Sequence, residues 1–529
     1  NLGIVNYSGT FDGQGHTISF DWNSNGDARA PFYVVNDATI KNLRIKGQIT
    51  EKKKCDVAGF VYGVEGTATT TFSNCISEGD VKNSGNDGCI SAGFVFHIRN
   101  GSVIMNDCIY KGKFTPANNG NHEGMVAFVA TMQGDINYTL NNCLYIGENN
   151  ATGGNTFAPN ATLNNCYYLN ACGSEYKQGE QVTADQLKNG YVAYKLQNSR
   201  NNMVWGQDLN KDTEPLLTGN DAKRVRKVEF TYNSQVKATR YATNGKGIHG
   251  GLPTFTAKDL MGSDYNEHHY YSGIAFEDGF SGSTTVNADR KVAINLAEKD
   301  CYEIASKENW KEFCVLVNGG QTKLNAKMTA NVDLGSDITM AGTNAHEYSG
   351  MFDGQGYTLK LNWDSGSNGY IAPFSVVEGA TIRNLRTEGQ ITSNEKFLSG
   401  LLMSAYGTIT LTNCVSNVNI TSSILISACD AAGMIYSVKP GANVTIDDCV
   451  VKGNITATTD IGKDKMAGFV GSQEGTCTLN NCLYLGSSNG DTFSRTFVGD
   501  ASYGATTPLN NCYYLNACGV AQGTKITAE

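Results

Sequence analysis

The stretch TTTFSNCI, residues 69–76, shows the pattern that decides the fold. It is a short run of β-branched residues that is bounded by glycine and ends in an Asn-Cys pair, and NVTIDDCV at residues 443–450 alternates in the same way. The surrounding repeats contain no window of helical length with helical spacing. These features predict short β-strands separated by Asn and Gly turns.

The Asn-Cys pair marks a repeat. It recurs about every 30 residues, a period typical of solenoids, and a second marker such as Ala58-Gly59-Phe60 runs in phase with it. Equivalent residues of a parallel β-helix stack ~4.8 Å apart and form ladders. We expect the second residue of each marker, Cys or Leu, to lie in a buried ladder, with the cysteines as free, stacked thiols. The ladder positions are Leu43, Cys75, Cys108, Cys143, Leu385, Cys414, Cys449 and Cys482.

The repeats fall into two copies of one domain. SGTFDGQGHT at residues 8–17 returns as SGMFDGQGYT at residues 349–358, and NCYYLNACG at residues 165–173 returns unchanged at residues 511–519. The first copy continues into a tail that the second does not show, and the second has a leader that the first does not show. We therefore expect this chain to be a window of a longer tandem protein.

Two helices are predicted outside the coils. Trp310, Phe313, Cys314 and Val317 have helical spacing, with Ser306 as N-cap and Gly319 as C-cap, so this helix should cover the open first coil. Residues 183–197 should form a helix that covers the opposite end of the first copy. Alternation in residues 226–232 and 285–295 predicts strands between the copies.

The predicted fold class is all-β, with two tandem right-handed parallel β-helix domains, short capping helices and a small β connector domain. Residues 1–220 form the first β-helix, truncated at its start, with its C-terminal cap. Residues 221–298 form the connector. Residues 299–529 form the leader helix and the second β-helix, truncated at its end.

Composition and charge exclude several classes of protein. The chain has 529 residues, of which 17% are charged and 10% aromatic, a balance that excludes a disordered chain. With 41 basic and 50 acidic residues, the net charge of −9 argues against nucleic acid as a partner. No apolar stretch approaches the ~18 residues of a membrane span. We expect no cofactor.

The residues that could carry chemistry favour structural roles. Asp12 and Asp353 stand in Asp-Gly-Gln-Gly and are typical turn formers. Asp107 and Asp448 stand at the repeat marker, which indicates a capped turn or a ladder. His268-His269 has no standard ligand spacing. The alternating oxygen ligands of residues 208–212 lack the Gly and distal Glu of a calcium loop, so we expect neither a catalytic nor a metal site.

The remaining cysteines suggest disulfides. Cys166 with Cys172, repeated as Cys512 with Cys518, is the better candidate pair because its six-residue spacing is duplicated at the final coil. Cys55 and Cys89 lie at equivalent positions of adjacent coils, where stacking could bring them within bonding range. Lys396 takes the first of these positions in the second copy, so that bridge cannot be general.

The motifs resemble a known family. The leader at residues 310–320, the strand at residues 326–334, the FDGQG turn at residues 352–356 and the Gly-Phe-Val and Asn-Cys coils are similar to secreted proteins with GLUG-motif β-helix repeats. Phe or Met stands where that family usually has Leu, at Phe60, Phe94, Met434 and Phe469. The resemblance implies a large adhesin-like surface or secreted protein of Gram-negative anaerobes, without a shared catalytic site.

Two classes of function follow. The first is a non-catalytic adhesin-like segment, secreted or at the bacterial cell surface, that binds an extracellular glycan or protein or neighbouring copies of the array, or acts as a rigid spacer. The alternative is a polysaccharide-processing β-helix enzyme, a lyase or a hydrolase. Three acidic side chains converging on one groove beside an Arg or Lys would favour the enzyme. Ladders of Asn and aromatic residues without such a cluster would favour the adhesin.

Overall fold

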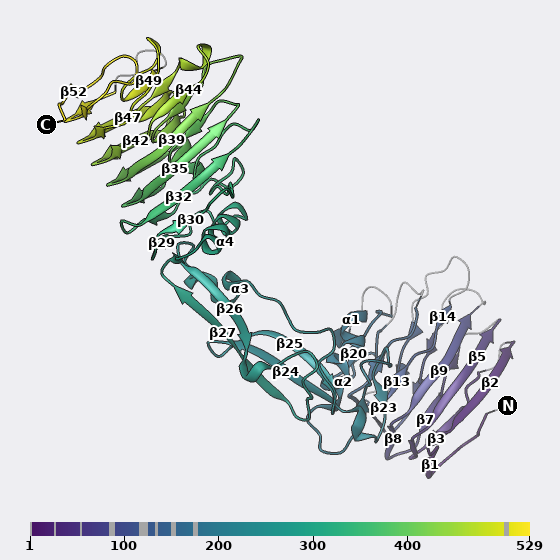
Figure 1. The fold of residues 1–529 in the computed structure, drawn as a ribbon. Coiled ribbons are helices and arrows are strands. Elements are labelled where there is room, and N and C mark those ends of the chain that lie inside the picture. Colours follow the sequence, from purple (N-terminus) through teal and green to yellow (C-terminus); the bar gives the residue numbers. More distant parts are fainter. Residues whose placement is uncertain are drawn as a thin grey trace. The chain divides into compact units, whose positions relative to one another are not determined.

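The computed structural model describes residues 3–25, 28–52, 56–83, 90–115, 125–132, 136–149, 155–172, 178–501 and 507–528. The chain divides into two compact units. Unit 1 comprises Asn1–Phe255 with Ala275–Asn295, and unit 2 comprises Thr256–Ile274 with Leu296–Glu529. Each unit contains a parallel β-solenoid whose short strands stack in layers (Figure 1).

The solenoid of unit 1 has three sheets, which we name by their place in the coil. Sheet I precedes the Asn-Cys marker, sheet II follows it, and sheet III follows the Ala-Gly-Phe marker. Sheet I contains β1 (Thr10–Asp12), β4 (Thr39–Lys41), β8 (Thr69–Ser73), β12 (Ser102–Asn106), β17 (Tyr138–Asn141) and β19 (Thr162–Asn164). Sheet II contains β2 (Thr17–Ser24), β5 (Arg44–Glu51), β9 (Ile76–Asn83), β13 (Ile109–Tyr110), β18 (Leu144–Tyr145), β20 (Tyr167–Tyr168) and β21 (Glu180–Gln181), with β14 (Phe114–Thr115) beside β9. Sheet III contains β3 (Phe32–Asn36), β7 (Val61–Glu65), β11 (Val95–Ile98) and β16 (Val129–Met132), preceded by the short strands β6 (Val57–Ala58), β10 (Ser91–Ala92) and β15 (Met125–Val126).

Unit 2 repeats the three sheets with more coils. Its sheet I contains β28 (Tyr302–Ile304), β29 (Ala326–Met328), β31 (Met351–Asp353), β34 (Thr381–Arg383), β38 (Thr408–Thr412), β42 (Asn443–Asp447), β47 (Thr476–Asn480) and β50 (Leu509–Asn510). Its sheet II contains β30 (Val332–Asp333), β32 (Thr358–Asp364), β35 (Arg386–Ser393), β39 (Val415–Ser422), β43 (Val450–Val451), β48 (Leu483–Tyr484), β51 (Tyr513–Tyr514) and β52 (Thr524–Lys525), with β44 (Ile455–Ala457) beside β39. Its sheet III contains β33 (Phe374–Glu378), β37 (Leu402–Tyr406), β41 (Ile435–Val438), β46 (Val470–Gln473) and β49 (Val498–Ala501), with the short strands β36 (Leu398–Ser399), β40 (Ala431–Ala432) and β45 (Met466–Ala467).

Aromatic stacking fills the core of unit 1. The rings of Phe60, Phe94, Phe128 and Phe157 follow one another with centroid distances of 5.0, 5.2 and 5.2 Å and are fully buried. This spacing is the spacing of the coils, so each ring packs on the face of the next. These four Phe residues therefore build a continuous column.

Helix α4 (Lys307–Asn318) confirms the predicted leader helix of unit 2. Ser306 Oγ accepts a hydrogen bond from the backbone N–H of Asn309 at 3.2 Å, and Gly319 is the C-cap. Trp310 and Phe313 are fully buried, and the Trp310 ring lies 5.7 Å from the ring of Phe374 in the first coils. The helix thus covers the apolar interior at the start of the solenoid.

The predicted single helix over residues 183–197 is wrong. The structure has two helices, α1 (Ala184–Lys188) and α2 (Tyr191–Gln197), which are separated at Gly190 with φ 95°. This conformation favours glycine, and a Cβ there would lie 3.0 Å from Leu209, Tyr241 and Val225 side chains. The two helices pack on a flank of the solenoid, against Ile109, Leu144 and Tyr167 of sheet II.

Between the solenoids the chain forms small β elements. β22 (Trp205–Gly206) pairs with β23 (Leu216–Leu217), and β24 (Val225–Tyr232) pairs antiparallel with β25 (Gln235–Thr243) and parallel with β27 (Arg290–Lys299). α3 (Ala257–Met261) and β26 (Tyr270–Phe276) lie in the same stretch of chain. The residues predicted as a connector are shared between the two units. Among the described helices, none combines the length and the apolar character needed to cross a membrane.

Replacing Trp310 tests the role of α4. We expect Trp310→Ala to lower the free energy of unfolding of unit 2 by about 3–5 kcal/mol, because it removes a fully buried indole. The matched control is Val315→Ala in the same helix, where the side chain is 70% exposed and the expected change is within about 0.5 kcal/mol. Urea unfolding of both variants measures the difference, and equal values would show that α4 does not seal the core.

Candidate functional site

The repeat marker forms a hydrogen-bonded ladder on the outside of each turn. The Asn or Asp of each marker has a positive φ, for example 54° at Asn74 and 55° at Asn165. Asn74 Nδ2 donates to Asn42 Oδ1 at 3.2 Å, and Asn165 Nδ2 donates to Asn142 Oδ1 at 2.8 Å. Since Asn tolerates the left-handed region and its amide is both donor and acceptor, these bonds fix the turns of the coils that they join.

The aspartates of the DGQG segments belong to the same ladder. Asp12 Oδ1 accepts from the backbone N–H of Gln14 and from Asn42 Nδ2, both at 3.0 Å. The Asn42 hydrogen bond lowers the pKa of Asp12. Asp353 makes the equivalent bond to Gln355 at 2.9 Å and a salt bridge to Arg383 at 2.8 Å. Both side chains therefore close turns, as the sequence predicts.

The thiols lie one residue further on, inside the coil. The marker thiols are fully buried and free: Cys75, Cys108, Cys143, Cys414, Cys449 and Cys482. Leu43 and Leu385 are buried at the equivalent positions of their coils. Burial raises the pKa of Cys143, which favours its neutral form. Cys55 and Cys89 lie outside the described residues.

The two disulfides predicted from the sequence are not formed in the structure. Cys166, Cys172, Cys512 and Cys518 are free. Cys166 follows the left-handed Asn165 and points to the ladder, with its Sγ 3.3 Å from the Leu140 carbonyl oxygen. The thiol of Cys172 instead donates to the Met125 carbonyl oxygen at 2.7 Å. Although Cys166 and Cys172 are only six residues apart in the sequence, their thiols therefore lie at different corners of the coil.

The other candidate ligands are used in ion pairs and hydrogen bonds. His269 Nδ1 lies 2.7 Å from Glu298 Oε1, whereas His268 Nδ1 lies 2.9 Å from the Lys323 carbonyl oxygen. Lys246 binds Asp208 at 2.9 Å, and the next carboxylate of that loop, Asp212, is bound by a lysine too. Within the described residues no group of His, Cys, Asp and Glu could hold a metal ion.

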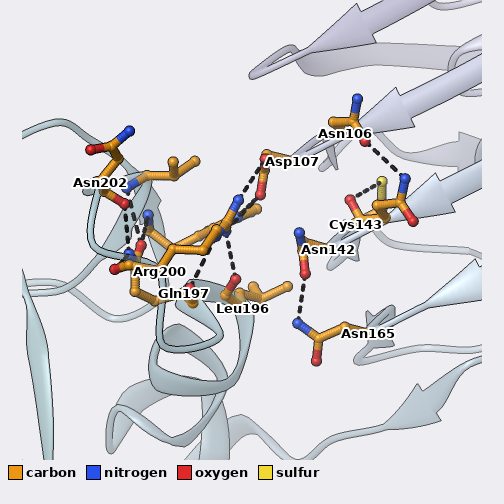
Figure 2. A network of polar contacts seen from close by, with 12 residues as sticks. Asn106, Asp107, Asn142, Cys143, Asn165, Leu196, Gln197, Arg200 and Asn202 are labelled. Carbon is orange, nitrogen blue, oxygen red and sulfur yellow. Dashed lines mark hydrogen bonds and ion pairs between the residues drawn. The ribbon is translucent and has the colours of Figure 1, made fainter.

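One marker residue anchors the helical cap of unit 1 (Figure 2). The guanidinium of Arg200 donates to both oxygens of Asp107 at 2.9 and 3.0 Å, and Trp205 Nε1 donates to Asp107 Oδ1 at 2.7 Å. Trp205 is fully buried, and the Asp107 side chain is only 10% exposed. Arg200 also donates to the carbonyl oxygens of Leu196 and Gln197 at the end of α2. A bidentate, charge-assisted contact thus fastens the cap to the solenoid.

The candidate functional site is a polar groove on the outer face of sheet II in unit 1. It has a volume of about 510 Å³ and is lined by Phe20, Asp21, Lys46, Gly47, Gln48, Glu78, Asp80 and Lys111. Asp21, Gln48 and Asp80 occupy one rung of β2, β5 and β9, because the strands pair in register at these residues. The convergence of three carboxylates beside lysines is a feature that the sequence reading did not find.

Each carboxylate of the groove has a donor. Gln48 Nε2 donates to Asp21 Oδ1 at 2.9 Å, and the backbone N–H of Lys113 donates to Asp80 Oδ1 at 2.8 Å. Glu78 forms a salt bridge with Arg44 at 2.5 Å. Asp21 and Asp80 are exposed and Glu78 is half-buried. The groove is therefore a solvated, hydrogen-bonding surface.

A second cleft lies at the edge of the cap. It has a volume of about 590 Å³ and brings the amide ladder at Asn42 and Asn74 and the Arg44 side chain against Met203 and Leu217. The cleft carries amide and guanidinium groups and contains no carboxylate among its lining residues. It could bind a polar ligand but offers no acid and base pair.

Comparisons with known proteins identify neither a family nor a function for the chain. No family model matches the chain, and no curated protein matches it. One solved structure, described as "a putative immunoglobulin A1 protease from Bacteroides ovatus", is similar over 40% of this chain and 75% of its own, with 16% identity and a TM-score of 0.31. At that identity and TM-score the likeness carries no argument about fold or activity.

The cap anchor predicts a contrast between the two units. Asp107→Asn should lower the free energy of unfolding of unit 1 by about 2 kcal/mol, because it removes a charge-assisted bidentate contact. Asp448→Asn, at the equivalent and exposed position of unit 2, should change stability by less than about 0.5 kcal/mol. Asn is suited to the positive φ of both positions, so neither variant strains its turn. Denaturant unfolding with hydrogen exchange on α2 measures both, and equal effects would contradict an anchoring role.

The thiols give an independent prediction. Burial raises the pKa of Cys172 and raises that of Cys518 to about 11. The thiolate is the reactive species, so at pH 8 these residues should resist iodoacetamide in the native protein and react after denaturation without a reductant. Mass spectrometry of non-reduced peptides distinguishes the outcomes. A peptide that links Cys166 to Cys172 would contradict the free thiols.

Proposed function

We propose that the chain is a non-catalytic, adhesin-like segment of a secreted or cell-surface protein that binds a hydroxyl-rich extracellular glycan. The resemblance of its coils to GLUG-motif repeats supports this class of protein. In the proposal the solenoids are rigid supports, and the outward side chains of their strands are the binding groups. An extracellular protein or a neighbouring copy of the array is the other kind of partner that such ladders fit.

One observation carries the non-catalytic proposal. The rung Asp21, Gln48 and Asp80 of unit 1 becomes Asn362, Gln390 and Asn419 in unit 2. Gln390 Nε2 donates to Asn362 Oδ1 at 2.5 Å, as Gln48 donates to Asp21 at 2.9 Å. The backbone N–H of Asn454 donates to Asn419 Oδ1 at 3.0 Å, as that of Lys113 does to Asp80 at 2.8 Å.

An amide therefore does in unit 2 what a carboxylate does in unit 1. Both groups accept hydrogen bonds from hydroxyls, but only the carboxylate can act as an acid or a base. The property that the two units share is hydrogen bonding.

Unit 2 adds an aromatic surface that suits a sugar. Tyr370 is 58% exposed, and its ring lies 4.6 Å from that of Phe397, which lies 5.0 Å from that of Tyr436. Tyr370 also lines a groove of about 700 Å³ with the hydroxyls of Ser404 and Tyr406. An apolar ring face beside hydroxyl and amide groups can pack on the C–H face of a sugar and bond its hydroxyls.

The second candidate function is polysaccharide cleavage in unit 1. It is favoured by the convergence of Asp21, Glu78 and Asp80 beside Lys46. Asp21 and Asp80 lie on strands two coils apart, so their backbones are separated by roughly 10 Å, near the upper end of the carboxylate separations of inverting glycosidases. Against it, Asp21 and Asp80 are open to solvent and lack the desolvated setting typical of a catalytic acid, and the half-buried Glu78 is paired with Arg44.

The double variant Asp21→Asn/Asp80→Asn distinguishes the two functions, because it gives unit 1 the rung of unit 2. We expect the variant to fold and to retain binding to those glycans of a plant, host and bacterial panel that the parent binds, within about threefold. Neither protein should release oligosaccharides. Binding is measured on the immobilised panel and release by mass spectrometry of the supernatant.

The control is Asp460→Asn, which removes a carboxylate from an exposed ion pair with Lys463 in the other unit, where it does not line the groove. Reproducible release of oligosaccharides by the parent and by the control, lost in the double variant, would overturn the non-catalytic proposal.

A further inference from the structure

Unit 2 has a flank that matches the capped flank of unit 1 residue by residue. In unit 1 the outward rung of sheet II runs through Ile76, Ile109, Leu144 and Tyr167. In unit 2 the corresponding rung runs through Val415, Val450, Leu483 and Tyr513. The two rungs are apolar at every step, with a tyrosine at the same place in both.

The two flanks differ in what covers them. Ile109, Leu144 and Tyr167 are at most 3% exposed, because Leu187, Val192, Leu196 and Trp205 of the cap pack on them. In unit 2 Tyr513 is 41% exposed, and Val450 and Leu483 are only half-buried. Within its described residues, unit 2 therefore presents as surface the apolar rung that unit 1 buries.

The charged anchors of the cap are repeated as well. Asp107, which binds Arg200 and Trp205, corresponds to Asp448. Asp448 occupies the same position of the repeat marker and has a φ of 54°. Asp448 is exposed and, among the described residues, its side chain accepts a neighbouring amide from Asn481 Nδ2 at 3.1 Å. Within that part of the chain its carboxylate has neither an arginine nor an indole like those that its counterpart binds.

The second anchor is a lysine. Lys111, two residues beyond Ile109, forms a salt bridge with Glu214 in the cap of unit 1. Lys452 has the same place beyond Val450 and is exposed. One negative and one positive anchor thus flank the apolar rung at the same positions in both units.

We propose that this flank of unit 2, formed by Val415, Val450, Leu483 and Tyr513 with Asp448 and Lys452, is a docking site for a two-helix cap segment. The occupant has the chemistry of residues 183–217: an apolar helix face for the rung, an arginine and a tryptophan for Asp448, and a carboxylate for Lys452. Charge complementarity at two fixed points and the covered flank of unit 1 identify this occupant.

Grafting the cap onto unit 2 tests the proposal. Ile526-Thr527-Ala528 corresponds to Val182-Thr183-Ala184, so residues 185–220 can follow Ala528 in the same register. In this chimera of the full chain we expect hydrogen exchange at Leu483–Tyr484 and Tyr513–Tyr514 to slow by at least about tenfold relative to the parent. The fluorescence of the additional tryptophan should shift to shorter wavelength as its indole is buried.

Two variants of the chimera decide whether docking is specific. Asp448→Asn, which keeps a side chain suited to the turn, should return exchange at these strands to within about threefold of the parent, because it removes the charge that the arginine binds. Asp460→Asn, an equal change of charge away from the flank, should keep the protection. A chimera that shows no protection would overturn the proposal, and so would protection that survives Asp448→Asn.

A second measurement separates a rival occupant. If the flank instead pairs with a second copy of the chain, the parent should be a dimer in light scattering. Asp448→Asn should then make it monomeric. That result would overturn the cap as the occupant. A parent that is monomeric by the same measurement agrees with the proposal.

Discussion

Each repeat marker places an Asn or Asp with positive φ at the turn of its coil, and the rest of the structure depends on that turn. Asn and Asp hold it at values such as 52° for Asn42 and 53° for Asn481, a conformation that costs other side chains more. Their side chains form hydrogen bonds from one coil to the next, which fixes the register of the strands. The next residue then points into a crowded interior at the spacing of one coil, so a small apolar side chain, Leu or Cys, repeats there.

This constraint explains how a cap can attach to a regular surface. An amide ladder is self-satisfied, because each Asn donates to one neighbour and accepts from the other. An Asp on a rung can only accept, so the chain of donors is interrupted and acceptor capacity remains. Arg200 and Trp205 fill that capacity at Asp107. A single change from amide to carboxylate thus marks the rung where another segment docks, without disturbing the turn.

The sequence predicts what is periodic and misses what is not. The coils, the buried marker positions and α4 follow from spacing and from a cap residue at Ser306. The cap contacts could not be predicted, since Asp107 and Arg200 are 93 residues apart and no repeat relates them. The spacing of Cys166 and Cys172 suggests a bond, but in the structure the two free thiols lie against carbonyl oxygens of different residues, Leu140 and Met125. The acidic groove was within reach, because strand register alone places Asp21 beside Gln48 and Gln48 beside Asp80.

The two units also show which positions are free to vary. Exchanging the carboxylates of Asp21 and Asp80 for the amides of Asn362 and Asn419 removes two negative charges from a rung but leaves its hydrogen bonds in place. The turns and the inward ladder hold the backbone here, so the outward side chains of this rung can change their charge without changing the fold. A tandem array built on this plan can change the charge of one face from copy to copy while every copy keeps the same rigid coil.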